Sequence, residues 1–239
     1  EQLPPGELAV YLNDYFETLA APLKKYGVHV TEFRADAIMC AWTADQPSPE
    51  PRRQALLAAL EAGEAIKDFK RRHPTAEGKL RIGLEAGTVY VGHAGGGGRF
   101  VYSIVGDSAN TASRVEGLNK HVGTQILATG DVVEGFENLA TRYLGAFQFV
   151  GKTEATPIYE VMALRERATD EQLALRDAFK GAMLHYEQGD WQSAAAELEN
   201  VLVEFPDDGP SKFLLQRCRR AISDPATVGE PGVIRMDAK

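Results

Sequence analysis

An apolar stretch that meets a Gly-Asp pair and then continues as a helical pattern constrains this chain more than any other feature. Residues 101–105 are mostly apolar and predict a strand. Beyond the Gly-Asp pair, apolar residues recur at helical spacing from Ala109 to Leu118, and Asp107 or Ser108 can cap that helix. The chain must therefore pass from a strand through a tight turn directly into a helix.

Two polar residues of this helix, Asn110 and Arg114, lie four positions apart and share one face near its N-terminal end. An amide and a guanidinium side by side, together with the positive end of the helix, suit a phosphate-rich ligand. On spacing alone, a solvated helix face is the simpler interpretation, because arginine is common at such positions.

The residue order here and in other stretches resembles the class III nucleotide cyclases. Residues 102–116, which read Tyr-Ser-Ile-Val-Gly-Asp-Ser-Ala-Asn-Thr-Ala-Ser-Arg-Val-Glu, are similar to the signature helix of that family. Further similar stretches follow the family's order, and they are residues 30–42, 80–92, 144–152 and 158–161. The resemblance covers roughly residues 1–163 and implies an α+β domain with a ferredoxin-like βαββαβ core.

The resemblance implies a reaction and roles for the helical pair. In the family, the ribose 3′-oxygen of a purine nucleoside triphosphate attacks the α-phosphate and expels pyrophosphate, which gives the 3′,5′-cyclic monophosphate. By analogy, Asn110 orients the ribose and Arg114 stabilises charge on the phosphate. Lys152 follows a family-like glycine and could approach the triphosphate, although an ordinary turn lysine is an equal interpretation.

The resemblance also implies divalent metal ions and a homodimer. Asp36 matches one of the family's two metal-binding aspartates, which hold Mg²⁺ or Mn²⁺; outside the motif it would be read as a turn aspartate. The second aspartate lies upstream of Glu1 in the family, so two ions are expected if the parent protein carries it. In the family, the metal site and the Asn–Arg pair face each other across the homodimer interface.

Two positions read the base in the family, and here they hold Glu32 and Ser103. Adenylate cyclases usually have lysine at the first position. Glu32 instead offers acceptors to the N1–H and amino group of guanine. Family frequency makes ATP the default substrate, while Glu32 favours GTP. A second departure is Ala35, which stands where the family has glycine and is strained if the turn needs a positive φ.

Composition narrows the functional class. The net charge of −8 argues against a nucleic-acid partner, and no apolar run approaches the ~20 residues that span a bilayer. Two cysteines, Cys40 and Cys218, are too few for a disulfide framework and favour the cytoplasm. The chain begins at Glu1 without methionine, so we expect a piece of a longer protein. Membrane tethering through a module outside this chain is compatible with the family.

The predicted elements alternate between helices and strands. We expect a helix up to Gly27, a hairpin of residues 28–33 and 37–42, and a helix over 52–72. We also expect a hairpin of residues 80–85 and 88–93, followed by four glycines that form a flexible loop or, less simply, a phosphate cradle. Later elements are a helix over 108–120, a short helix from Thr129, and strands over 125–128, 140–150 and 158–162.

The C-terminal part reads as helix only. After a charged linker at 164–169, residues 170–224 resemble tetratricopeptide helices, and residues 225–239 read as a polar tail. Such helices predict a separate module that contacts a protein partner. Three hypotheses remain open: an active homodimeric cyclase, a degenerate cyclase-like dimerisation module with a peptide-binding helical tail, and an adaptor whose main function lies in that tail.

Overall fold

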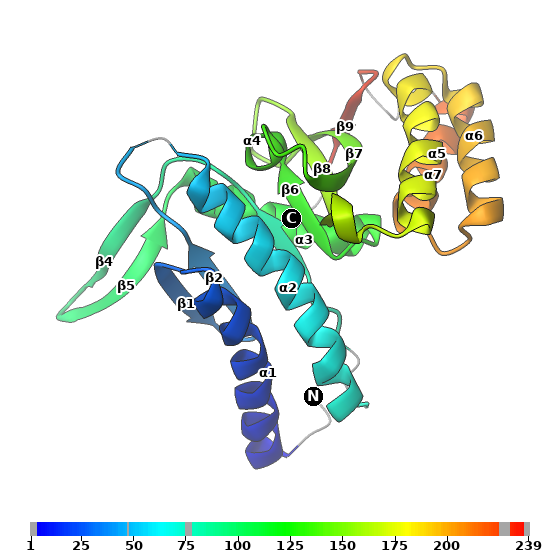
Figure 1. Ribbon diagram of the computed structural model, residues 1–239. Helices are drawn as coiled ribbons and strands as arrows, with labels where there is room; N and C mark the ends of the chain where they lie inside the picture. The colour runs from blue at the N-terminus through cyan, green and yellow to red at the C-terminus, as the bar shows by residue number, and fades with distance from the viewer. Residues whose placement is uncertain (1–3, 47, 75–77, 225–229, 237–239) are drawn as a thin grey trace. The chain divides into compact units, whose positions relative to one another are not determined.

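A computed structural model describes residues 4–46, 48–74, 78–224 and 230–236 of the protein (Figure 1). Two compact units divide the chain. The first comprises Glu1–Leu80 and Ala86–Thr111, and the second comprises Arg81–Glu85 and Ala112–Lys239. Helix α3 (Asp107–Val122) begins in the first unit and continues into the second. The mixture of helices and strands confirms the predicted α+β class.

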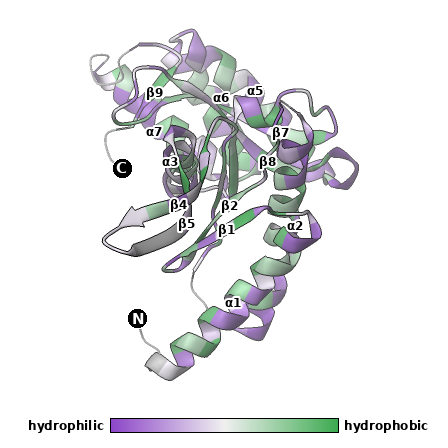
Figure 2. Cartoon of the chain, turned by 90° about the vertical axis from the view of Figure 1, so that its left-hand side faces the viewer, coloured by the Kyte–Doolittle hydropathy of each residue, from purple (hydrophilic) through white to green (hydrophobic). Residues whose placement is uncertain are grey.

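The first unit contains two long helices that pack along each other, α1 (Pro5–Lys25) and α2 (Glu50–Arg72). Proline stands in the first turn of each helix, where its missing N–H costs nothing. The ring of Phe69 is buried and meets the rings of Tyr11 and Tyr15 edge-on, with centroids 5.2 and 5.5 Å apart. Figure 2 shows hydrophobic and hydrophilic residues alternating along both helices, as amphipathic packing requires.

Two hairpins complete the first unit. One pairs β1 (Val30–Arg34) with β2 (Ala37–Ala41), and the other pairs β4 (Tyr90–Gly96) with β5 (Arg99–Val105). The second hairpin corrects two expectations. Residues 80–85 and 88–93 do not pair with each other, and the glycine run forms a strand end and a tight turn. Gly97 and Gly98 have φ of 61° and 81°, the conformation that closes a two-residue hairpin and directs β4 onto β5.

The second unit is built on a five-stranded sheet with the order β3-β6-β8-β7-β9. Strand β3 pairs parallel with β6, β8 pairs antiparallel with both β6 and β7, and β9 pairs parallel with β7. The strands span Ile82–Leu84, Ile126–Thr129, Leu139–Gln148, Thr156–Leu164 and Val233–Arg235 for β3, β6, β7, β8 and β9 respectively. The short helix α4 (Gly130–Val133) follows β6, and a 3-10 turn, Arg165–Arg167, follows β8.

Three helices lie between β8 and β9 in the chain, and each begins at a capped N-terminus. They are α5 (Asp170–Glu187), α6 (Trp191–Glu204) and α7 (Gly209–Ser223). The side chains of Thr169, Asp190 and Asp208 each accept a hydrogen bond from the backbone N–H three residues further on, in the first turn of the respective helix. The helical character predicted for this segment is confirmed, while its likeness to tetratricopeptide repeats and its protein partner stay predictions.

These helices share one hydrophobic core with the sheet. Leu144 and Phe147 of β7, Phe179 of α5 and Ile234 of β9 are buried in the same cluster, which also includes residues of α3, α6 and α7. The expected polar tail therefore contains a strand, because Ile234 needs a buried site and the edge of β7 supplies one. The expectation of a separate helical module did not foresee this shared core, and the predicted domain boundaries stay predictions.

In the described ranges, no helix is both long and apolar enough to cross a bilayer.

Candidate active site

Helix α3 carries both residues of the predicted phosphate-binding pair. It starts directly after β5, as the sequence predicted, and Gly106 makes the turn with a φ of 152°. Asn110 is exposed and Arg114, one helical turn later, is half-buried. The Nη1 atom of Arg114 is buried and has no hydrogen-bond partner within the described ranges. Arg114 thus has unused donors of the kind that an anionic ligand satisfies.

The predicted metal ligand lies at the tip of the first hairpin. Arg34 of β1 pairs with Ala37 of β2, which leaves Ala35 and Asp36 as a two-residue turn, and Asp36 is exposed. Ala35 has a φ of 52°, a conformation that favours glycine. The turn therefore does require the positive φ for which alanine is a strained choice.

The two residues predicted to read the base, Glu32 and Ser103, contact each other. The Ser103 hydroxyl donates to Oε2 of Glu32 at 2.8 Å, and the backbone N–H of Ile104 donates to the same oxygen at 3.3 Å. Arg34 adds two hydrogen bonds, from Nε to Oε1 at 2.8 Å and from Nη2 to Oε2 at 3.2 Å. Glu32 is therefore bonded to strand β5 and to its own strand at once.

Electrostatics keeps this glutamate ionised. The hydrogen bonds from Arg34, supported by Ser103 and Ile104, lower the pKa of Glu32 to about 2 against a smaller opposing effect of burial. Sequence reasoning missed Arg34. The available signal was its spacing, because residues two apart on a strand project from the same face.

Lys152 lies in the turn that joins β7 to β8, and its residue is half-buried. Its backbone N–H donates to the carbonyl of Phe149 at 3.0 Å, and the side chain of Gln148 donates to its carbonyl at 3.3 Å. These bonds fix the backbone of the turn, and a role for the ammonium group stays a prediction.

The predicted site residues are divided between the units. Glu32, Asp36, Ser103 and Asn110 belong to the first unit, whereas Arg114 and Lys152 belong to the second. The structure brings together Glu32 with Ser103, and it places Asn110 and Arg114 on one helix.

Asp36 offers one exposed carboxylate to a metal ion. Within the described ranges no three His, Cys, Asp or Glu side chains gather into a ready-made metal cluster. Magnesium commonly keeps several waters and binds through one or two carboxylates and substrate phosphates, so an exposed single carboxylate is compatible with it.

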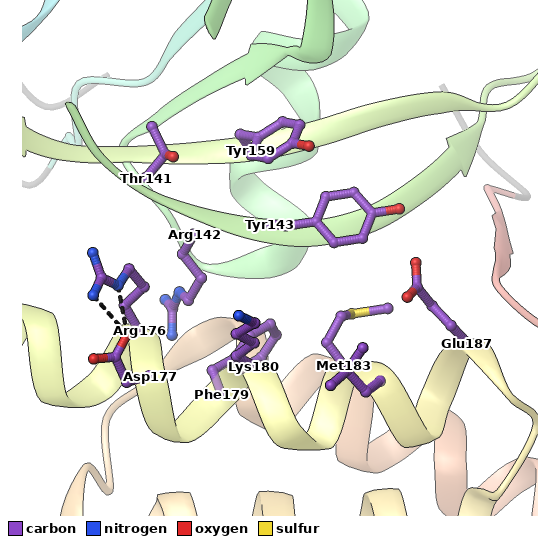
Figure 3. Close-up of a pocket in the computed structure, with 11 residues that line it drawn as sticks. Thr141, Arg142, Tyr143, Tyr159, Arg176, Asp177, Phe179, Lys180, Met183 and Glu187 are labelled. Carbon is purple, nitrogen blue, oxygen red and sulfur yellow. Dashed lines mark hydrogen bonds and ion pairs between the residues drawn. The ribbon is translucent and has the colours of Figure 1, made fainter. Parts of the chain in front are cut away.

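A buried ion network, which sequence reasoning also missed, lies in the second unit. Arg142 of β7 donates to Glu160 of β8 at 2.6 Å and to Asp208, the N-cap of α7, at 2.8 Å. Its guanidinium also covers the ring of Phe179 at 4.8 Å. Arg142 is one of the residues that line a pocket of about 370 Å³. Figure 3 shows Arg142 beside α5. The network joins the sheet to two of the C-terminal helices.

Comparison with known proteins agrees with this arrangement. The family model "Adenylate and Guanylate cyclase catalytic domain" matches residues 1–159, a range that contains the strand β5, the turn at Gly106 and helix α3. The chain belongs to that family.

Two similar proteins carry the name adenylate cyclase. The chain is 32% identical over 164 residues to adenylate cyclase 1 of Rhizobium meliloti (strain 1021), in an alignment that covers 67% of this chain and 25% of that protein. It is also 32% identical over 174 residues to the adenylate cyclase of Anabaena cylindrica, covering 68% of this chain and 34% of that protein. The chain thus spans between a quarter and about a third of these relatives.

Solved structures share the fold. The adenylyl cyclase CyaB from P. aeruginosa has a TM-score of 0.61 at 21% identity, covering 70% of this chain and 88% of that one. The guanylyl cyclase Cya2 has a TM-score of 0.58 at 23% identity, covering 70% and 86%.

Proposed function

We propose that this chain is the catalytic domain of a nucleotide cyclase that converts a purine nucleoside triphosphate to its 3′,5′-cyclic monophosphate and pyrophosphate. The observation that carries the proposal is the pair Asn110 and Arg114 on α3, where Arg114 keeps a buried donor without a partner in the part of the chain that the structure describes. Family membership and the adenylate cyclase relatives support the same chemistry.

The chain's own residues then have distinct tasks. Arg114 places a permanent positive charge against the phosphate as negative charge develops in the transition state. Asn110 positions the ribose so that its 3′-oxygen faces the α-phosphate. An Mg²⁺ or Mn²⁺ ion held by Asp36 and the substrate phosphates would lower the pKa of the 3′-hydroxyl and neutralise phosphate charge. Lys152 would add a cation toward the triphosphate.

Exposed apolar side chains on the hairpins support a homodimer. Phe33, Tyr90 and Tyr102 are 56%, 60% and 54% exposed, and Val105, which pairs with Tyr90 across the hairpin, is 47% exposed. Tyr90 and Val105 are neighbours on one face of their hairpin, and exposed apolar side chains that lie side by side mark an interaction site. A second copy of this chain is the occupant that a site shared between subunits requires.

Complementation between two inactive variants tests both the activity and the sharing of sites. Asp36→Ala and Arg114→Ala are each expected to lower the turnover of ATP or GTP in Mn²⁺, the latter by about 10²-fold or more. An equimolar mixture should recover activity, because one site of the mixed dimer keeps both residues. A mixture as inactive as either variant alone would contradict shared sites.

One observation favours the alternative, a cyclase-like dimerisation module without catalysis. The positive φ of Ala35 strains the turn that presents Asp36. Absence of cyclic nucleotide from either triphosphate, in a preparation that is folded and dimeric, would support that alternative.

A further inference from the structure

The carboxylate of Glu32 is held at both oxygens within the first unit. Oε1 accepts from Nε of Arg34, and Oε2 accepts from Nη2 of Arg34, from the Ser103 hydroxyl and from the Ile104 backbone. The two bonds from Arg34 run side by side, which is the bidentate arrangement of guanidinium and carboxylate. One edge of Glu32 is therefore already paired.

The geometry of strand β1 brings Glu32 and Arg34 together and leaves the Arg34 side chain partly exposed to solvent. Glu32 and Arg34 are two residues apart on β1, so their side chains project from the same face. The Glu32 side chain is 19% exposed and that of Arg34 is 48% exposed. Arg34 thus covers the outer side of a mostly buried carboxylate, and its replacement leaves no core cavity.

Resting on the cyclase function proposed above, we propose that Arg34 is a positioning residue that makes the base site select adenine over guanine. Guanine would pair with a glutamate through two neighbouring donors, N1–H and the amino group. Such a pair needs both carboxylate oxygens along one edge, and Arg34 occupies that edge of Glu32. Guanine can therefore engage Glu32 in this way only after Arg34 has left.

The donors that remain on Arg34 point to the same selection. A guanidinium carries five N–H donors, and Arg34 uses two of them on Glu32. The remaining donors suit the N1 of adenine, which is an acceptor. They oppose the N1–H of guanine, because two donors that face each other cannot form a hydrogen bond. The Glu32–Arg34 pair accordingly offers donors where an isolated Glu32 would offer acceptors.

Selectivity between ATP and GTP tests this proposal. We would measure kcat/KM for both nucleotides in Mn²⁺ with the full chain and with Arg34→Ala. The wild type should favour ATP, and Arg34→Ala should move the ratio of ATP to GTP toward GTP by about tenfold or more, because Glu32 regains its free edge. Arg34→Lys should shift the ratio in the same direction, since an ammonium cannot pair bidentately.

Two controls separate this effect from general loss of charge or fold. Arg53→Ala removes an exposed arginine of the same unit that pairs with Glu50, and it should leave the ratio unchanged. Glu32→Gln combined with Arg34→Ala should lose the gain for GTP, because the amide keeps one acceptor oxygen and replaces the other with a donor, so it cannot accept from both N1–H and the amino group of guanine. A ratio that stays within twofold of wild type in Arg34→Ala, or a wild type that prefers GTP, would overturn the proposal.

A binding measurement keeps this proposal distinct from the cyclase function itself. Calorimetric titration with 3′-deoxy-ATP and 3′-deoxy-GTP, which lack the reacting hydroxyl, should show the same shift in relative affinity. If neither nucleotide is cyclised but the affinity ratio shifts in Arg34→Ala, the catalytic proposal fails while the role of Arg34 stands. If cyclisation occurs and neither ratio moves, only the role of Arg34 is wrong.

Discussion

The hairpins of the first unit and the sheet of the second unit differ in the number of apolar residues that are buried around them. Around the hairpins, Val30, Ile104 and Ala109 form a small buried cluster. The core of the second unit joins buried residues from four helices and four strands. Glu32, Asp36 and Ser103, which carry much of the expected chemistry, all lie on the hairpins. The groups that we propose to bind substrate and metal thus lie where few buried apolar contacts oppose local movement, and the larger core belongs to the second unit.

The largest expected effect concerns the buried ion network of the second unit. Arg142→Ala would leave Glu160 and Asp208 without their cation, although their side chains are only 18% and 5% exposed. Breaking a buried pair from one side costs about 3–5 kcal/mol, which urea denaturation would measure. Arg219→Ala is the matched control, because Arg219 pairs with Glu199 on the surface and should change stability by less than about 1 kcal/mol. Equal effects would show that burial does not make the Arg142 network contribute more to stability than a surface ion pair.

A second prediction tests whether β9 belongs to that core. Ile234 is fully buried against the edge of the sheet, so Ile234→Ala should lower the free energy of unfolding by about 2–4 kcal/mol. Val203 on α6 is 84% exposed and provides the control, since Val203→Ala removes little buried surface. If Ile234→Ala behaves like Val203→Ala, residues 233–235 do not contribute to the core as the structure indicates.

Periodicity and motif order predicted most of the fold, because they depend on local signals. The strand–turn–helix around Asn110 and the long helix α2 follow directly from apolar spacing. The pairing of β3 with β6 could not be predicted in the same way, since a parallel pair joins residues far apart in the chain. Strand β9 was missed because three residues of strand in a polar stretch give no periodic signal.

The candidate site shows the same limit. The roles of Glu32, Asp36, Asn110 and Arg114 could be proposed because each stands in a motif with fixed spacing. The bidentate pair of Glu32 with Arg34 could not, because identical spacing on an exposed strand also permits two unpaired side chains. Buried partners such as Arg142 and Asp208 lie 66 positions apart and become neighbours only through the fold.

We expect a smaller effect on stability when acid protonates Glu32 in the first hairpin. The pKa of Glu32 is lowered from 4.5 to about 2, so its bonds stabilise the fold fully above pH 4.5 and lose this contribution as the pH falls through 2. Hydrogen exchange of the Ile104 amide, which donates to Glu32, reports the effect locally. Exchange in Glu32→Gln should be several-fold faster than in wild type near pH 6, and the difference should shrink toward pH 2. A difference that does not depend on pH would show that the charge of Glu32 is not what holds this contact.

The smallest expected effect concerns the strained turn, and it has the opposite sign. Ala35 adopts a φ of 52°, which costs an alanine about 1 kcal/mol and a glycine almost nothing. Ala35→Gly should therefore stabilise the first unit by roughly 0.5 kcal/mol, after the greater freedom of glycine in the unfolded chain is subtracted. Ala37→Gly on the adjoining strand is the control and should destabilise, because its backbone is extended and gains nothing from glycine. Thermal unfolding of both variants gives the sign of the change in stability, and cyclase activity adds a second measurement.

If strain at Ala35 holds Asp36 away from its working position, Ala35→Gly should also raise turnover in Mn²⁺. A stabilised variant with unchanged turnover would mean that the strain does not limit Asp36, and a destabilised Ala35→Gly would contradict the strain itself.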